Sequence, residues 1–194
     1  MRCSTIKRTT EETDISVRLN IDGTGNANID TGIGFLDHML ILFTSHGQFD
    51  MDIECKGDIY VDAHHTVEDI GIVLGKAFNQ ALGDKKGISR YGSIIMPMDE
   101  SLVMVNVDIS GRPYLHYNIG ELPPNLGEID SQSFEEFFRG FVNHCRVTVH
   151  INLLSGRNGH HIVESVFKGF GRALREAVTD VKSGEIPSTK GILD

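Results

Sequence analysis

The stretch Ala63–Glu68, with the sequence AHHTVE, recurs at Gly159–Glu164 as GHHIVE, 96 residues further along the chain. Gly75 recurs at the same spacing as Gly171. Two copies of so specific a pattern indicate an internal duplication, because chance rarely repeats adjacent histidines followed three residues later by glutamate. We therefore predict a single domain over residues 1–194, built from two tandem repeats at about 1–90 and 91–194.

The hydrophobic pattern within each repeat predicts strands followed by helices. Apolar and polar residues alternate, as in half-buried strands, over five runs: 15–21, 49–55, 102–109, 114–119 and 147–153. Apolar stripes at helical spacing run over 35–43, 67–81, 134–141 and 163–181. Each repeat therefore has two or three predicted strands and two helices. The predicted fold class is α+β, with a duplicated unit, a sheet packed on helices, pseudo-two-fold symmetry and a loop-like tail over 182–194.

Composition limits the classes of protein to consider. Hydrophobic residues make up 40% of the 194 residues, which is enough for a packed core. The formal charge of −9 argues against nucleic acid and anionic membranes as partners. No apolar run reaches the roughly 20 residues that span a bilayer. The three cysteines have no CxxC spacing, so a reducing cytoplasm is the expected compartment.

The histidine pairs are candidate metal ligands. His64 and Glu68 are four residues apart, so on a helix they lie one turn apart on the same face. His160 and Glu164 repeat this relation. A solvated helix start is the alternative interpretation. The duplication favours metal binding, because paired histidines repel when protonated and gain little without a metal.

The remaining ligands are expected from neighbouring positions. The second histidine of each pair, His65 or His161, points about 100° away from the first and so faces a different centre. The pattern therefore predicts two sites, each with a clamp from one helix and a histidine from the other. His38 and its repeat counterpart Glu136 are the further candidates. Imidazole and carboxylate ligands suit Mn, Fe, Zn, Co or Ni.

Five separated motifs resemble one known family, from about Arg8 to the C-terminus. They are Gly32–Leu40, Asp62–Asp69, Ser110–Tyr114, Gly156–His161 and Pro187–Gly191. Together they are similar to imidazoleglycerol-phosphate dehydratases of histidine biosynthesis. The resemblance implies a duplicated α+β fold and a homo-oligomeric shell of 24 subunits. It also implies active sites at subunit interfaces, with two Mn²⁺ ions each.

The resemblance also assigns the ligands of each ion. One set is His38, His65, His160 and Glu164. The other set is His64, Glu68, His161 and a position that holds histidine in the family and Glu136 here. If each ligand of one set is replaced by its counterpart in the other repeat, the result is the other set, which supports the assignment. A further departure is Leu42, where the family often has glutamine near the substrate, so we assign Leu42 no substrate contact.

The implied reaction removes water from D-erythro-imidazole glycerol phosphate and yields imidazole acetol phosphate. The proton to be abstracted lies on a carbon without an adjacent carbonyl, so the imidazole ring must supply the driving force. A metal on a ring nitrogen would lower the ring N–H pKa, and the metal-bound imidazolate could expel the hydroxyl. Glu12 matches the substrate-binding glutamate of the family and is the first candidate for the base, and Asp99 and His46 are weaker ones.

The phosphate of such a substrate needs fixed cations in this acidic chain. Arg90, Arg112, Ser188 and Lys190 match the phosphate-contacting positions of the family. Two other functions stay open. A non-catalytic metal-binding shell protein would not need an anion pocket, and a metal-dependent hydrolase of a phosphorylated small molecule would release free phosphate.

Overall fold

The computed structural model describes residues 1–193. Each half of the chain runs through three strands, a helix, a further strand and a long helix, and the second half adds a small hairpin. The first half contains β1 (Cys3–Thr9), β2 (Thr13–Asn20), β3 (Ala27–Asp30), α1 (Gly34–Gly47), β4 (Asp50–Gly57) and α2 (His64–Leu82). The second contains β5 (Tyr91–Met98), β6 (Ser101–Asp108), β7 (Tyr114–Asn118), β8 (Asn125–Leu126), β9 (Ile129–Asp130), α3 (Ser133–Cys145), β10 (Thr148–Ser155) and α4 (Gly159–Val178).

The two main sheets have the same strand order, β1-β2-β4-β3 and β5-β6-β10-β7. In each sheet the last strand is parallel to its neighbour and the other pairs are antiparallel. The predicted α+β class is therefore confirmed. The predicted number of strands per repeat was too low, because the edge strands β1, β3 and β5 bury few side chains. Ser4 is the only buried residue of β1, and β3 has none.

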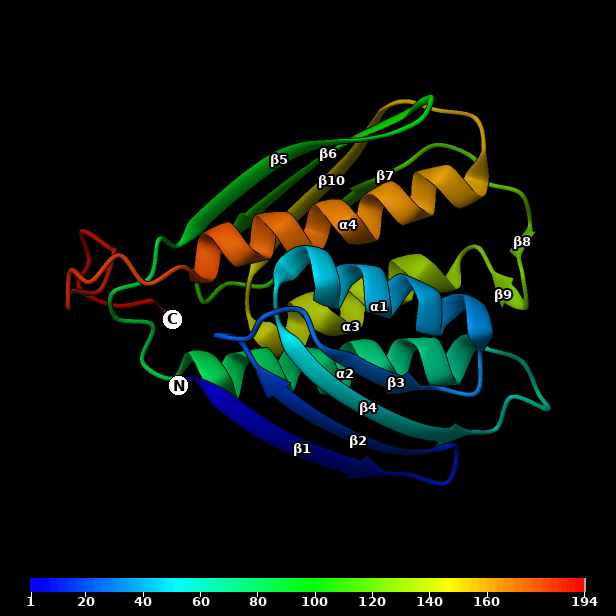
Figure 1. Ribbon diagram of the computed structural model, residues 1–194, viewed down its shortest axis with the longest axis horizontal. Coiled ribbons are helices and arrows are strands. Elements are labelled where there is room, and N and C mark those ends of the chain that lie inside the picture. The colour runs from blue at the N-terminus through cyan, green and yellow to red at the C-terminus, as the bar shows by residue number, and fades with distance from the viewer. Residues whose placement is uncertain (194) are drawn as a thin grey trace.

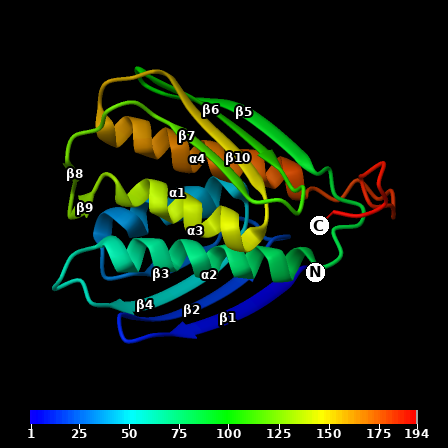
Figure 2. The same cartoon turned by 180° about the vertical axis from the view of Figure 1, so that it is seen from behind.

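The helices form the middle of the molecule and the two sheets cover them on opposite sides (Figure 1). The long helix α2 lies on β1 and β2, and α4 lies on β5 and β6. Each short helix packs on the long helix of the other half, α1 on α4 and α3 on α2 (Figure 2). Aromatic side chains pack across this contact between the two halves: Phe43 of α1 stacks on Phe170 of α4 with 5.4 Å between ring centroids. The two repeats therefore share one core.

The repeated glycines lie where the helices cross. A Cβ atom added to Gly171 of α4 would meet the carbonyl oxygen of Phe43 at 2.5 Å. A Cβ atom added to Gly75 of α2 would meet the carbonyl oxygen of Phe141, also at 2.5 Å. These obstacles are backbone atoms of the partner helix, so they cannot move by a side-chain rotation. The recurrence of glycine at this repeat position is thus explained by close helix packing.

We expect Gly171→Ala to lower the free energy of unfolding by about 1–3 kcal/mol, because α1 and α4 must separate to admit the methyl group. Urea unfolding of the metal-free protein measures this. Gly34→Ala is the matched control, since no atom lies within 4 Å of a Cβ built there. Equal stabilities for the two variants would contradict the close approach at Gly171.

All four helices run in the same direction, so their N-termini gather at one end of the molecule (Figure 1). Both chain termini and the segment 182–193, which contains no helix or strand, lie at the other end. The last residue of the predicted tail, Asp194, lies outside the described residues. Among the described residues, no helix combines the length and the apolar composition that crossing a membrane requires.

Candidate active site

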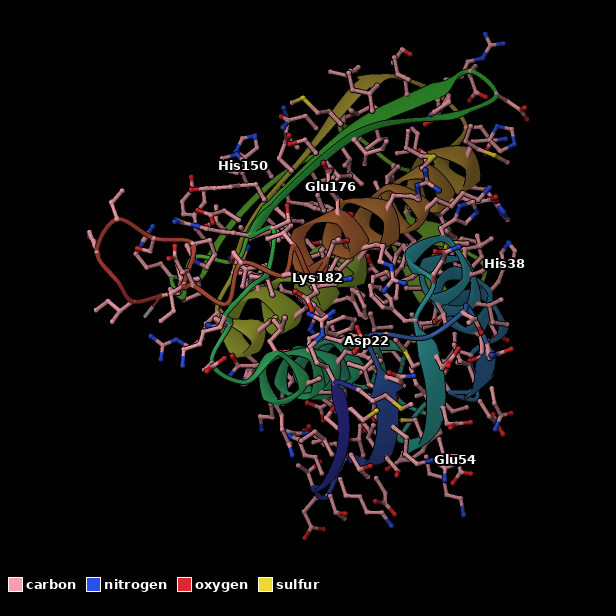
Figure 3. All side chains as sticks on the ribbon, turned by 60° about the vertical axis from the view of Figure 1, so that its left-hand side comes forward. Asp22, His38, Glu54, His150, Glu176 and Lys182 are labelled. Carbon is pink, nitrogen blue, oxygen red and sulfur yellow. The ribbon has the colours of Figure 1, made fainter. Side chains whose placement is uncertain are left out.

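The eight predicted metal ligands lie in the first two turns of the four helices. His38 is on α1 and Glu136 on α3, and the two clamps with their adjacent histidines are on α2 and α4. Because the helices are parallel, these residues share one end of the molecule (Figure 1). Figure 3 shows His38 at this edge, while the tail beyond Lys182 extends on the other side.

His38, His160 and Glu164 form a compact cluster. Glu164 Oε2 lies 3.2 Å from His160 Nε2 and 3.8 Å from His38 Nε2. The three candidate ligand atoms all lie within 4.8 Å of one another. The cluster joins α1 of the first repeat to α4 of the second, a contact that the packing of these helices provides.

The carboxylate of this cluster is held in its charged form. Glu164 is only 7% exposed, and its Oε1 receives a hydrogen bond from Lys168. Burial alone would raise the pKa of Glu164, but Lys168, His38 and His160 together outweigh burial and lower it. Because Lys168 occupies Oε1, Oε2 is the atom directed at the two imidazoles. Two imidazole nitrogens and a carboxylate oxygen converging in this way fit a divalent transition metal.

The second histidine of each pair is oriented by a carboxylate. His65 Nδ1 lies 3.0 Å from Asp58 Oδ2, and His161 Nδ1 lies 2.8 Å from Glu100 Oε2. A carboxylate on Nδ1 fixes the ring and leaves Nε2 available, which is the usual arrangement of metal-bound histidine. Sequence reasoning missed both carboxylates as site residues. A signal for Glu100 existed, since it occupies the repeat position of Glu12, whereas Asp58 had none.

The candidate bases lie beside these histidines or further along α1. Glu12 Oε1 is 3.7 Å from His65 Nε2, and Asp99 Oδ2 is 3.8 Å from His161 Nε2. His46 lies about two turns beyond His38, where burial, Lys168 and Arg172 lower its pKa. The structure therefore places Glu12 beside His65 and Asp99 beside His161, each near the Nε2 atom of a predicted ligand, and His46 about two turns further along α1.

We expect Glu100→Gln to lower the pKa of His161, which the wild-type Glu100 carboxylate raises above its usual 6.5. The same contact lowers the pKa of Glu100 to about 2. The stabilisation from His161 is complete below pH 6.5 and is lost as pH rises through the raised pKa. That from Glu100 is complete above its usual pKa of 4.5 and is lost as pH falls toward 2.

NMR titration of the His161 ring in the metal-free protein measures this shift. Glu54→Gln is the matched control, since Glu54 lies on the outer face of β4 (Figure 3). An unchanged His161 titration in Glu100→Gln would contradict the role given to Glu100.

The remaining predicted ligands do not converge within one chain. His64 Nε2 lies 3.9 Å from Glu68 Oε2, as the clamp requires. Glu136 Oε1 instead lies 3.5 Å from Arg139 Nε. Among residues 1–193, His38, His160 and Glu164 are the one group of three candidate ligands within reach of a common ion. His65 is thus separate from the first predicted set, and the second set is not assembled.

The predicted phosphate-binding residues meet in a pocket at the other end of the molecule. Arg90, Arg112, Ser188 and Lys190 all line it, although they come from three separate segments of the chain. Arg90 also builds the pocket wall: its guanidinium donates to Asp108 and to the carbonyl oxygen of Pro187. The Arg112 side chain is exposed and makes no ion pair within residues 1–193.

The pocket and the cluster are far apart in one chain. The backbone N–H of Arg90 donates to the carbonyl oxygen of Ala177, near the C-terminal end of α4. His160 lies at the start of the same helix. At a rise of 1.5 Å per residue, the 17 steps from His160 to Ala177 cover about 25 Å. One small molecule therefore cannot contact both places in a single chain.

Fold and cluster together define a duplicated α+β protein with a histidine–carboxylate site at one end. Comparison with known proteins narrows this class: residues 31–174 match the family model of imidazoleglycerol-phosphate dehydratase. The chain belongs to the imidazoleglycerol-phosphate dehydratase family, as the resemblance of its motifs predicted. It is therefore an enzyme, a lyase of histidine biosynthesis that acts on a phosphorylated imidazole.

Individual relatives cover all or nearly all of the chain. The imidazoleglycerol-phosphate dehydratase of Clostridioides difficile (strain 630) is 60% identical over 193 residues, which is 100% of both chains. The crystal structure of the enzyme from Staphylococcus aureus is 43% identical with a TM-score of 0.83, covering 92% of this chain and 99% of that one. The Pyrococcus furiosus structure is 41% identical with a TM-score of 0.84, covering 97% and 100%.

Proposed function

We propose that this chain converts D-erythro-imidazole glycerol phosphate to imidazole acetol phosphate in a metal-dependent dehydration. The observation that carries the metal dependence is the convergence of His38, His160 and Glu164. Lys168 pairs with Oε1 of this buried carboxylate, so Oε2 and the two imidazole nitrogens that face it are left as donors for a metal ion. Membership of the family identifies the substrate class. A metal ion held by the cluster would activate the imidazole ring of that substrate.

The donor set fits two Mn²⁺ ions per active site, or another divalent transition metal. His38, His65, His160 and Glu164 would hold one ion. His64, Glu68 and His161 would hold the other, with Glu136 as the fourth candidate. When bound, the ions withdraw electrons from the substrate ring and make its N–H more acidic. Asp58 orients His65, and Glu100 orients His161, the second histidine of each pair.

Glu12 is the proposed base. Its Oε1 lies 3.7 Å from His65 Nε2, and its side chain is 52% exposed, so a substrate held at this end can reach it. The hydroxyl on the carbon beside the ring leaves as water by taking up the proton lost from the ring N–H. Glu12 Oε1 then accepts the proton from the neighbouring carbon and returns it to the ring nitrogen, and the resulting enol becomes the ketone. Asp99 lies 3.8 Å from His161 Nε2 and is the second candidate.

The active site is proposed to form between copies of the chain. The phosphate pocket and the ligand cluster are about 25 Å apart along α4, whereas the substrate spans roughly 10 Å. A pocket from one copy must therefore meet a cluster from another. This separation supports a homo-oligomer with active sites at its interfaces, and we propose the 24-subunit shell that the resemblance implies.

A cytoplasmic location is part of the same proposal. Cys3, Cys55 and Cys145 are all free, as expected in a reducing compartment. Burial raises the pKa of Cys55 and of Cys145 to about 12, so neither thiol is reactive at neutral pH.

A reconstitution assay tests the proposal. The protein is stripped with a chelator, and Mn²⁺ or Zn²⁺ is returned separately. We expect ketone formation without free phosphate, and only after a metal is returned. Release of phosphate would instead indicate the hydrolase, and metal binding without turnover would indicate the metal-binding shell protein. Full activity of the stripped protein would overturn the metal dependence.

We expect Arg112→Ala to raise KM for the substrate about 10- to 100-fold while leaving the binding of free imidazole unchanged. The loss corresponds to a charge-assisted hydrogen bond to phosphate. Steady-state kinetics and competition by imidazole measure the two effects. Arg18→Ala on the outer face of β2 is the control. Equal losses for substrate and imidazole would contradict a phosphate contact by Arg112.

A further inference from the structure

Thr13, the residue after the proposed base, is tied to the long helix α2 by a buried side-chain contact. Thr13 is 2% exposed, and Asp69 of α2 is 6% exposed. The hydroxyl of Thr13 donates to Asp69 Oδ2 at 2.5 Å, and the guanidinium of Arg8 pairs with the same oxygen. The first repeat therefore has a buried carboxylate next to the turn that carries Glu12.

The turn from Thr10 to Thr13 is also closed by hydrogen bonds of its own. The backbone N–H of Thr10 donates to the carbonyl oxygen of Thr13 at 2.8 Å, and the hydroxyl oxygen of Thr10 accepts the N–H groups of Glu12 and Thr13. The carbonyl oxygen of Glu12 accepts the backbone N–H of Asp58 at 3.0 Å. These bonds fix the backbone of Glu12 within the turn, and the contact between Thr13 and Asp69 fixes the turn on α2.

The second repeat holds its corresponding turn with neutral groups. There Ser101 contacts Ser165, with 2.9 Å between the two hydroxyl oxygens, and both serines are buried. Met96 of β5 occupies the repeat position of Arg8, so the ion pair is absent as well. The same fold is thus built without charge at this place, and a buried ion pair is often no more stabilising than neutral residues. The charged contact of the first repeat therefore calls for a reason other than stability.

The two repeats differ in what fixes the glutamate of the turn. The Glu100 carboxylate accepts the backbone N–H of Asn158 at 2.8 Å and contacts the His161 ring, so its own hydrogen bonds hold it. The Glu12 carboxylate accepts no hydrogen bond within the described part of the chain, and its Oε1 lies 3.7 Å from His65 Nε2. A carboxylate that has to accept a proton from a substrate is best left free of donors. Its position must then come from its backbone.

We propose that Asp69 is a positioning residue for Glu12 and acts through the hydroxyl of Thr13, with Arg8 keeping the buried carboxylate paired. The inference rests on the proposed function in one respect, namely that Glu12 is the base. Proton transfer needs the base within hydrogen-bond reach of the reacting group, and a displacement of about 1 Å can cost a factor of about 100 in rate. Loss of the contact should therefore slow the reaction while the metal and the substrate still bind.

Thr13→Val tests the contact, because valine keeps the branched shape of threonine but has no hydroxyl. Asp69→Ala is less suitable, since it would leave the charge of Arg8 unpaired and could unfold the protein. We expect Thr13→Val to lower kcat about tenfold or more, with KM and Mn²⁺ content near the wild-type values, and Thr13→Ser to restore kcat. Thr9→Val is the matched control, because it removes an exposed hydroxyl of the same hairpin, bonded to Asp14, and is expected to leave kcat unchanged.

A double substitution separates positioning from a general structural defect. In the Glu12→Gln background there is no base left to misplace, so adding Thr13→Val is expected to change kcat less than about twofold. The same fold-loss in both backgrounds would overturn the role of Asp69, and so would an unchanged kcat in Thr13→Val alone. Normal turnover by Glu12→Gln would refute the proposed base and this role with it. A defective Glu12→Gln beside a fully active Thr13→Val would refute only the role of Asp69.

Discussion

Glu164→Gln is expected to lower metal affinity by more than about 100-fold and to reduce turnover to background. Residues that merely orient a ligand cost 10- to 100-fold when mutated, so loss of a charged ligand costs at least as much. The amide has the same shape, but it cannot neutralise a divalent cation between His38 and His160. It also leaves the partly buried Lys168 ammonium beside a neutral group.

Metal content after dialysis and calorimetric titration with Mn²⁺ measure the affinity, and ketone formation measures turnover. Glu54→Gln, on the outer face of β4, is the control for a generic loss of one carboxylate. Circular dichroism of both variants checks that the fold persists. A Glu164→Gln protein with normal metal content and turnover would show that the cluster is not a metal site.

Glu12→Gln is expected to reduce kcat on the order of 100-fold or more while metal content and KM stay near the wild-type values. The amide keeps the position of the side chain beside His65 but cannot accept a proton. A ligand substitution would lower metal content as well, so the pattern of losses separates a base from a ligand.

Glu11→Gln is the control for this variant, because Glu11 is an exposed neighbour on the same turn. If Glu12→Gln turns over normally, Glu12 is not the base, and Asp99→Asn becomes the next substitution to measure. Asp99 comes next because it lies 3.8 Å from His161 Nε2, much as Glu12 lies 3.7 Å from His65 Nε2.

Much of the fold was predictable because it rests on local patterns. The alternating runs found β2, β4, β6, β7 and β10, and the helical stripes found all four helices. The edge strands β1, β3 and β5 escaped because they bury almost no side chains, so their sequences lack a clear alternation. The carboxylate of Asp58 escaped for a related reason: a single acidic residue before a helix looks like solvated surface until its contact with His65 is seen.

The sequence by itself determined the duplication, the clamps at four-residue spacing and the family, because these depend on the order and periodicity of residues. The resemblance had grouped the ligands and the phosphate-binding residues, but only the tertiary structure decided that His38 meets His160 and Glu164 within one chain without His65, and that Arg112 meets Ser188 and Lys190 in one pocket. Both meetings join residues far apart in the chain, and they follow from how helices and sheets pack, as the crossing at Gly171 shows. The ligand cluster and the phosphate pocket are far apart within one chain because they lie at opposite ends of α4. This distance depends on the direction and length of the helix, which no local pattern specifies.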